Sequence, residues 1–599
     1  MLSRVEDVLA KGTYDYIVIG GGTAGLTLAS RLAEQSSHTV LVLEAGPDNL
    51  NDPALLLPAS YGAQFRNDAY CWTYKVAKQR HTVDRENIWD RGKGLGGSSA
   101  VNFMCWLRPS KDDIDDIERL GNPGWNWNHL DRLLKKLEGY VPPSNPKVMN
   151  GMAKLADGRL GTDGPLSISY PPAATELEML TLESLNAMGI PIAPDPFGGD
   201  INGVWITPNA YDAVSHTRNY SATVFYLPNK DRTNLHVLTK ASVGRILTEK
   251  SGNGNITATS VEFYHGGTKY AVKVGKEVIV SAGTLKSPQV LELSGIGRKD
   301  VLDKIGVPVE VNLSGVGRNV QEHIFQAMSY ELKDDVPYET IDILRDPILA
   351  AKQRELHATG LGAYTTGIVE FGYMPPKSVS PGAQKAVQKA KEEICKNWDT
   401  YPPELQAQYE VEIARIDREA PSCEIILLKG FFGMPNPPIP GKKYINFFSC
   451  VNHALSRGTI HAISSDPSDE PEFDPHYFEQ DADRKILEEQ VHFIRKVTST
   501  GPLKDVVVRE VNPGPDVQNE KDIRDWVEKY FNTVWHTCGS CSMMPREKGG
   551  VVDTKLKVYG TNNIRVVDLS ILPIHIAAHP LATVYGIAEH GLECILETV

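Results

Sequence analysis

Apolar runs and amphipathic stretches alternate at the start of the chain. Residues Tyr14–Gly20 form a short β-branched run that ends in glycines, and a stretch with helical periodicity follows from Ala24 to Glu34. A second apolar run, Thr39–Leu43, comes directly after it. Two strand-like runs on either side of a helical stretch predict a strand–helix–strand unit.

Similar patterns recur further along the chain. Leu235–Thr239, Ile256–His265 and Glu277–Ser281 have the β-branched, apolar character of strands. Residues Leu285–Leu293 have helical periodicity and are followed by Ser294-Gly295, which is typical of a helix end. The first half of the chain is therefore predicted to be largely α/β.

The second half shows a different arrangement. Tyr444–Val451 and Gly458–Ile463 are predicted strands of a second sheet, and Ala482–Thr498 is predicted to be its helix. Residues 380–420 are strongly charged, and Pro402-Pro403 divides them into two helix-prone pieces. We interpret these pieces as a pair of solvated surface helices.

Length and charge limit the classes of function. At 599 residues the chain exceeds the roughly 250–300 at which single cores stop growing, so two domains are expected. A net charge of −13 argues against nucleic acid as the main partner. No apolar run approaches the ~20 residues of a membrane span, and Met1–Asp15 is too polar for a signal peptide. The pattern predicts a cytoplasmic protein, although a secreted chain without its leader would look the same.

A glycine-rich turn follows the first predicted strand. Gly20-Gly21-Gly22-Thr23-Ala24-Gly25 fits G-x-G-x-x-G at the opening of a predicted helix. Gly20 permits the tight turn, Gly22 lets the backbone approach a pyrophosphate, and Gly25 lets helix and strand pack closely. Glu44 ends the next strand, where an acid accepts hydrogen bonds from ribose hydroxyls. These features predict a dinucleotide site but do not separate FAD from NAD.

A second glycine-rich segment runs from Arg91 to Asn102. Its small residues allow backbone to approach a ligand closely. From this pattern alone, a flexible surface loop is an equally good interpretation.

This segment resembles the first signature of the glucose-methanol-choline (GMC) family of flavin oxidoreductases. Gly283–Gly297 resembles the second signature of the family, and Gly315–His323 resembles the loop that follows it. Glu322 stands where the family usually has Asp, a difference that we expect to be structural. Trp535–Ile595 resembles the closing segment of the family, and the whole pattern is closest in type to fungal aryl-alcohol oxidases and dehydrogenases.

The resemblance implies a fold and a cofactor. The expected fold is α/β, with a doubly wound, Rossmann-like FAD-binding domain and a second, α+β substrate-binding domain. The FAD-binding domain is expected to span residues 1–330 with a return of 530–599. The substrate-binding domain is expected to span 331–529, with part of about 166–204.

The resemblance also implies cofactor-binding residues. They are Gly20, Gly22, Thr23, Ala24, Gly25, Glu44, Ser98, Asn102, Phe103, Cys105, Val243, Asp568 and Leu569. Val243 is expected against the adenine, and Ser98 and Cys105 beside the isoalloxazine or its ribityl chain. Val101 occupies the position where some members attach FAD through a histidine, so FAD is expected to be non-covalent.

Two histidines are the candidate catalytic residues. Removing hydride from an alcohol carbon requires that the hydroxyl proton also be taken, and histidine has a suitable pKa of about 6.5. His536 and His579 both lie in turn-rich segments. From the residues alone each is more simply structural, but the resemblance implies that they lie side by side at the flavin. We therefore expect His536 to be the base and His579 to hydrogen-bond the substrate oxygen.

The expected reaction is the oxidation of a primary alcohol, aromatic by the habit of the family, with oxygen or a quinone-type acceptor reoxidising the flavin. A lyase or cyclase of the same fold is the alternative. Cys538 and Cys541 beside His536 suggest zinc or dithiol chemistry, but no fourth ligand lies nearby and no metal is predicted. The remaining histidines of interest are expected to be structural or to support the site, namely His216, His323, His575 and His590.

Overall fold

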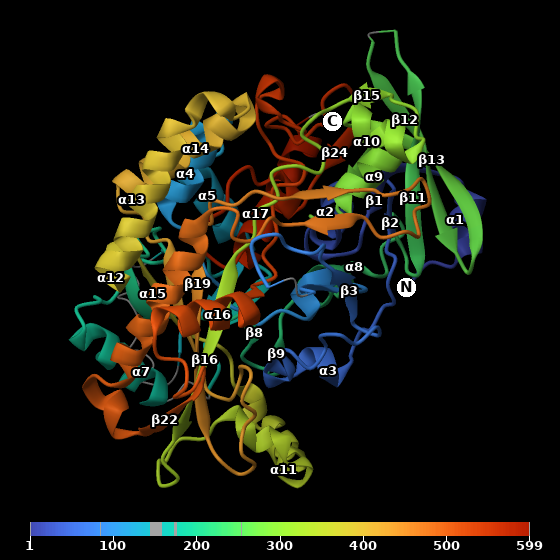
Figure 1. Cartoon of the computed structure of the whole chain (residues 1–599). Coiled ribbons are helices and arrows are strands. Elements are labelled where there is room, and N and C mark those ends of the chain that lie inside the picture. The colour runs from blue at the N-terminus through green and yellow to red at the C-terminus, as the bar shows by residue number, and fades with distance from the viewer. Residues whose placement is uncertain (1, 84–85, 144–157, 173–175, 253, 598–599) are drawn as a thin grey trace.

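The computed structural model describes residues 2–83, 86–143, 158–172, 176–252 and 254–597. Its first large sheet has seven strands (Figure 1). In spatial order they are β10 (Leu235–Leu238), β2 (Val40–Leu43), β1 (Thr13–Ile19), β13 (Thr268–Val280), β12 (Ile256–His265) and β11 (Ala241–Lys250), with β24 (Ile564–Val566) also paired to β13. The strands from β10 to β13 and β24 are parallel, whereas β11, β12 and β13 form an antiparallel meander.

The predicted strand–helix–strand unit is confirmed. The helix α2 (Thr23–Gln35) connects β1 to its parallel neighbour β2. The predicted strand at 277–281 is the end of the longer β13, whose first half alternates between exposed and partly buried positions. The predicted helix at 285–293 is α9 (Ser287–Leu293).

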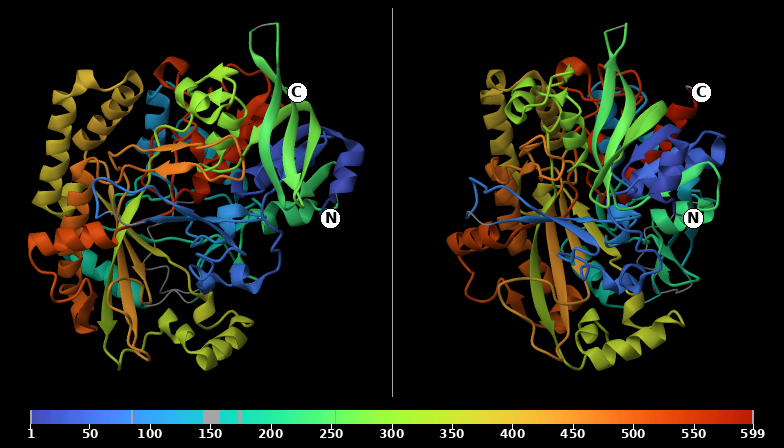
Figure 2. Two further views of the ribbon diagram at one scale, coloured as in Figure 1. Left: turned by 45° about the vertical axis from the view of Figure 1, so that its right-hand side comes forward. Right: turned by 90° about the vertical axis from the view of Figure 1, so that its right-hand side faces the viewer.

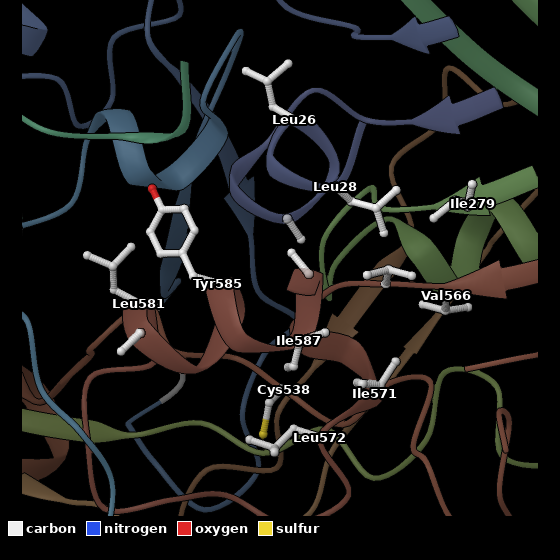
Figure 3. Close-up of a cluster of buried hydrophobic side chains, with 14 of the residues drawn as sticks. Leu26, Leu28, Ile279, Cys538, Val566, Ile571, Leu572, Leu581, Tyr585 and Ile587 are labelled. Atoms are coloured by element: carbon white, nitrogen blue, oxygen red, sulfur yellow. The ribbon is translucent and has the colours of Figure 1, made fainter. Parts of the chain in front are cut away.

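The carboxy-terminal helix α17 (Leu581–Leu596) packs against α2 and is buried on most of its surface. Figure 3 shows Leu26 and Leu28 on α2 and Ile279 on β13, with Tyr585 and Ile587 on α17 below α2. All five side chains are at most 1% exposed. Burial of each contributes about 1.5–3 kcal/mol, so this contact holds the end of the chain firmly on the first sheet.

The second large sheet also has seven strands, and all its pairings are antiparallel. In spatial order they are β22 (Val507–Asn512), β16 (Ile324–Leu332), β19 (Tyr444–Val451), β18 (Cys423–Leu428), β17 (Glu370–Met374) and β7 (Gly203–Ile206), with β23 (Asn532–Thr533) paired to β16. The helix α15 (Asp481–Thr498) contacts β16 and β19. Figure 2 shows this sheet and α11 (Pro347–His357) at the end of the molecule opposite to the β11–β12 hairpin.

The predicted strand at 458–463 is present, but its assignment to the second sheet is wrong. Residues Thr459–His461 form β20, which pairs with β21 (Glu472–Asp474) in a two-stranded sheet separate from the large one. Ile460 and Phe473 are opposite each other in this pair and are almost fully buried. The short apolar run therefore finds a nearby partner strand instead of the large sheet.

Residues 380–420 form the two predicted helices, but one side of each helix is buried and not exposed to solvent. The helix α13 (Pro381–Lys396) buries four small or apolar residues and packs against α15. The helix α14 (Pro403–Asp417) buries Arg415, whose Nε lies 2.8 Å from Asp116 Oδ2. A stretch of charged residues does not show which of them have buried partners, so the sequence did not predict this ion pair.

The proposed domain boundaries remain a prediction. The strand β16 of the second sheet begins at Ile324, and β23 at Asn532 pairs with it, so both strands lie within a few residues of the expected boundaries at 330 and 530. Residues 144–157 and 173–175, near the expected boundary at 166, lie outside the described residues. Within the described part of the chain, no helix is both long and apolar enough to cross a membrane.

Candidate active site

A cavity of about 530 Å³ takes its wall from both large sheets. Every predicted cofactor-binding residue except Gly25 lines it, and so do His536 and His579. Residues of the second sheet, among them Phe325, Ile426 and Phe448, line it as well. The volume is within the range of about 300–1,000 Å³ that small-molecule sites occupy.

The glycine turn forms one part of this wall. Gly20 has a φ of +104°, and a Cβ there would lie 2.4 Å from the carbonyl oxygen of Ser281. A Cβ at Gly22 would meet its nearest heavy atom only at 3.8 Å, so this glycine faces open space in front of α2. Gly25 lies behind the wall, where a Cβ would come within 2.1 Å of the carbonyl oxygen of Gly20. The turn therefore presents the backbone at the positive end of α2 to the cavity.

Glu44 is tied to this turn. Its two carboxylate oxygens accept hydrogen bonds of 2.7 Å from the backbone N–H groups of Gly21 and Gly46. Burial raises the pKa of Glu44 above its ordinary value, although these donors favour the charged form. Glu44 thus fixes the turn in addition to lining the cavity.

The second glycine-rich segment is packed and is not a free surface loop. A Cβ at Gly97 would lie 2.7 Å from the Cα of Gly22, so the two glycine-rich segments touch through their backbones. Ser98 faces the cavity. Asn102 Oδ1 accepts a hydrogen bond of 2.7 Å from the buried Arg218, which holds its amide in place.

Asp568 connects the closing segment to the second signature. Its carboxylate accepts hydrogen bonds from Gly283 N at 2.9 Å and from Ser287 Oγ at 2.6 Å. It also caps the short helix that begins at Leu569 by accepting from Ser570 N. Asp568 and Leu569 therefore reach the cavity from a rigid junction.

The structure brings His536 and His579 together. Their ring centroids are 4.5 Å apart with an interplanar angle of 67°. His536 follows β23, whereas His579 lies just before α17. Two loops at the ends of elements from different parts of the chain thus converge on one point of the cavity wall.

The surroundings of His536 favour a neutral ring. Its backbone N–H donates to Glu322 Oε1 at 2.7 Å, and its Nδ1 lies 2.9 Å from His323 Nδ1. Burial lowers the pKa of His536 well below its ordinary value, and the charges of His579, His575 and Arg91 lower it further. A neutral imidazole offers one ring nitrogen as a proton acceptor.

The surroundings of His579 favour the opposite state. Its Nε2 donates to Glu424 Oε1 at 3.1 Å, and the hydroxyl of Tyr373 donates to the same oxygen at 2.5 Å. Burial opposes the charge, but the Glu424 carboxylate and a hydrogen bond with Cys105 raise the pKa of His579 to about 10. The pair thus combines a neutral and a protonated imidazole at neutral pH.

A group of aromatic residues also lines the cavity. The residues concerned are Phe65, Phe103, Phe325, Phe432, Phe448 and Trp535. Phe65 and Trp535 have ring centroids 4.6 Å apart, and Phe325 and Phe448 are 5.2 Å apart. The charged side chains of the wall come from other segments, namely Glu44, Asp90, Arg91, Lys286, Glu470 and Asp568.

Sequence analysis missed Glu424 as the partner of His579. The available signal was weak: Glu424 is the one acidic residue in the otherwise apolar run Cys423–Leu428. A carboxylate in a fully buried strand requires a partner, which would have marked it as unusual. Glu322 was expected to be structural, and His323 and His575 were expected to be structural or to support the site; each of the three contacts His536 directly.

Cys538 and Cys541 have no visible role in the chemistry. Both thiols are buried and free, and neither residue belongs to the cavity wall. Burial raises the pKa of each well above its ordinary value, and Figure 3 places Cys538 beside Leu572 in the core. Among the described residues, no group of three or more His, Cys, Asp or Glu side chains is arranged to hold a metal ion.

Comparison with known proteins identifies the family. One GMC oxidoreductase model matches residues 14–325, and a second matches residues 454–588. The chain belongs to the GMC oxidoreductase family. A GMC oxidoreductase family protein of Malassezia sympodialis, Mala s 12, is 33% identical over 98% of this chain and 92% of its own length.

Solved structures agree with this assignment. An FAD-dependent oxidoreductase from Chaetomium thermophilum has a TM-score of 0.89 at 28% identity, covering 98% of this chain and 99% of its own. A fungal aryl-alcohol oxidase has a TM-score of 0.83 at 26% identity, with the same coverage. This GMC protein is therefore an FAD-dependent oxidoreductase with the fold of the family.

The residues of the cavity fit FAD. Open space in front of Gly22 and the helix end behind it suit a pyrophosphate, and the contact between Gly22 and Gly97 keeps both backbones close to it. Glu44 and Val243 lie on the same wall, and His536 and His579 lie on it as well. A single cavity thus offers both a dinucleotide-binding turn and a pair of acid–base groups.

Proposed function

We propose that this GMC oxidoreductase oxidises a primary alcohol, with an aromatic alcohol as the best-fitting class, and that His536 and His579 act on the hydroxyl group. The observation that carries the proposal is the position of His536 and His579 on the cavity wall, with ring centroids 4.5 Å apart. Burial lowers the pKa of His536, whereas the Glu424 carboxylate, against the effect of burial, raises the pKa of His579, so the surroundings favour one neutral and one protonated ring. A base that takes the hydroxyl proton must be unprotonated, and a group that stabilises the developing alkoxide must carry a proton. The two rings satisfy these requirements at the same pH.

Each ring has a separate task in this scheme. FAD held in front of Gly22 and beside Ser98 would supply the acceptor for the hydride of the alcohol carbon. His536 takes the hydroxyl proton on the ring nitrogen that does not contact His323. His579 donates a hydrogen bond to the substrate oxygen, and Glu424 keeps its ring charged while that oxygen becomes negative.

The aromatic wall supports an apolar, ring-bearing substrate. Phe325, Phe432 and Phe448 offer ring faces and edges. Aromatic contacts contribute about 0.5–1.5 kcal/mol each beyond the burial of area. The name of the structural neighbour, an aryl-alcohol oxidase, points in the same direction.

The attachment and reoxidation of the flavin are also part of the proposal. Val101 lines the cavity, and its hydrocarbon side chain has no nucleophilic atom that could bond to FAD. The flavin is therefore held non-covalently. Oxygen or a quinone-type compound serves as the electron acceptor.

An anaerobic panel of alcohols tests the proposal. Benzyl alcohol and related primary aromatic alcohols should bleach the visible absorption of the bound flavin, whereas glucose and choline should bleach it much more slowly. Absence of bleaching by every alcohol would contradict the proposal and favour the lyase or cyclase alternative. Faster bleaching by glucose or choline would contradict the substrate class alone.

A further inference from the structure

Among the described residues, the ring of His323 makes a single hydrogen bond, and that bond goes to the proposed base. The residue immediately precedes β16 and is fully buried. Its Nδ1 lies 2.9 Å from His536 Nδ1, whereas its Nε2 is buried without a hydrogen-bond partner in the described part of the chain. A buried polar ring with a single hydrogen bond requires an explanation, because the unpartnered atom is unfavourable.

A hydrogen bond between His323 Nδ1 and His536 Nδ1 requires one proton, which is attached to one of the two nitrogens. Two lone pairs at 2.9 Å would repel each other, and two N–H groups would clash, so one ring must donate and the other accept. If His323 Nδ1 carries the proton, the lone pair of His536 Nδ1 points to His323, and His536 presents its Nε2–H group to the cavity. With the proton on His536 Nδ1, the lone pair lies on His536 Nε2 instead, where it can act as a base.

We propose that His323 is a positioning residue that accepts a hydrogen bond from the Nδ1–H group of His536 and thereby fixes the basic lone pair of His536 at Nε2. The inference rests on the proposed function, in which His536 is the base. His323 itself touches neither the substrate nor the proton that leaves the hydroxyl group.

His575 holds this arrangement from the other side. Its Nδ1 accepts from Ile576 N at 2.9 Å, and its Nε2 donates to the carbonyl oxygen of His536 at 2.9 Å. Both nitrogens are therefore occupied, and a single tautomer of His575 satisfies both bonds. Its ring stacks on that of His323 with centroids 3.6 Å apart, which fixes the plane of His323.

A neutral partner gives the base a particular property. Glu322 is adjacent to His323, but its oxygens accept from His536 N and from the Thr537 hydroxyl instead of from the His536 ring. A carboxylate at the ring would raise the pKa of His536, as Glu424 does for His579. A neutral imidazole orients the ring without that effect, so His536 stays unprotonated at neutral pH.

Three substitutions of similar shape test the inference. Leu, Asn and Asp all branch at Cγ, and the latter two place a polar atom where His323 Nδ1 stands. His323→Leu should slow anaerobic flavin reduction by about 10²-fold, the lower limit of what a general base contributes. His323→Asn should restore most of the rate, because its amide oxygen accepts the same proton. His323→Asp should move the acid limb of the pH profile upward by about 1–3 units, because its charge stabilises the imidazolium.

A measurement independent of turnover follows the same ring. Diethyl pyrocarbonate modifies unprotonated imidazole, and peptide mass spectrometry of the flavin-loaded protein gives the rate for His536 at each pH. The pH at which the modification rate of His536 is half-maximal should rise in His323→Asp and stay unchanged in His323→Asn. His357→Leu is the matched control, because His357 is a buried histidine outside the cavity wall whose ring hydrogen-bonds the carbonyl oxygen of His216.

A double variant separates positioning from packing. His323→Leu should add little to the defect of His536→Ala, because the two residues act as a unit. The inference is overturned if His323→Leu slows flavin reduction in the His536→Ala background by the same factor as in the unmodified protein. It is also overturned if His323→Asp leaves both the modification profile of His536 and the pH profile of the rate unchanged. If His536→Ala reduces its flavin at the normal rate, the proposed base fails instead, and the modification profiles still decide whether His323 controls the His536 ring.

Discussion

The cavity wall at the first sheet is made mainly of backbone, whereas the wall at the second sheet is made of side chains. Gly22 and Gly97 meet through their Cα atoms in front of α2, and the acid nearby, Glu44, holds backbone N–H groups. At the second sheet, Phe448 and Glu424 project from neighbouring strands toward the cavity and His579. Backbone contacts suit the dinucleotide part of FAD, which is the same in every FAD enzyme, and side chains suit the substrate, which differs between enzymes.

This difference predicts that binding and chemistry are separable. A change among the side chains should alter the reaction and leave FAD in place. A change in the glycine turn should release FAD and leave the side chains of the second sheet undisturbed.

The largest effect is expected at His536. His536→Ala should retain FAD but slow anaerobic flavin reduction by about 10²–10⁴-fold, because general-base catalysis contributes on this scale. Stopped-flow absorbance measures the rate, and the ratio of absorbances at visible and ultraviolet wavelengths gives the flavin content. His579→Asn, which keeps a hydrogen-bonding group, should be milder than His579→Ala. A normal rate in His536→Ala at full flavin occupancy would return His536 to a structural role.

The next effect concerns the glycine turn. Gly22→Val places a side chain in the open space before α2, so FAD should bind at least tenfold more weakly, which equals about 1.4 kcal/mol. The variant should purify with little yellow colour, and titration with FAD gives its dissociation constant. Gly252→Val is the control, because Gly252 is an exposed residue of the β11–β12 hairpin with no atom within 4 Å of a built Cβ. Normal flavin content in Gly22→Val would contradict the assignment of the turn.

The two kinds of wall also differ in how well the sequence predicts them. The turn from Gly20 to Gly25 and the acid Glu44 lie within one strand–helix–strand unit, so local spacing is sufficient to place them. The partner of His579 is 155 residues away in sequence, and only the antiparallel order of the second sheet brings it near. Local patterns contain no information about such a pairing.

The same limit explains the other errors. The run at Thr459–His461 has strand character, but the pattern does not say which strand it pairs with. The charged stretch around Arg415 has helical character, but the pattern does not say which charges are buried. For the histidine pair, the resemblance to the GMC family supplied the expectation that the residues alone did not support.

A smaller effect is expected at the partner of His579. Glu424 raises the pKa of His579 to about 10, so the imidazolium is present below that pH and is lost as the pH rises through it. Glu424→Gln removes the charge, and the basic limb of flavin reduction should move down toward the ordinary histidine value of about 6.5. If the limb moves by about two pH units, from about 10 to about 8, the rate at pH 9 falls by about tenfold, which is less than the loss of a complete acid or base.

Tyr373→Phe is the matched control for this variant. It removes a hydrogen bond to Glu424 Oε1 but keeps the carboxylate, so the basic limb should move much less. If the limb has the same position in Glu424→Gln and in the unmodified protein, then Glu424 does not set the charge of His579.

The smallest effect concerns the aromatic wall and uses two neighbouring residues of β19. Phe448 lines the cavity and packs edge-on against Phe325 and Phe432, whereas Phe447 points to the opposite face of the strand and contacts Tyr330. Phe448→Leu keeps an apolar side chain but removes the ring. It should lower kcat/KM for an aromatic alcohol by about 2–10-fold, because one aromatic contact contributes about 0.5–1.5 kcal/mol. An aliphatic alcohol has no ring to stack, so its kcat/KM should change little. Phe447→Leu should lower the melting temperature without changing the preference between the two alcohols. If Phe448→Leu affects both alcohols equally, the ring supports the fold of the cavity and does not select aromatic substrates.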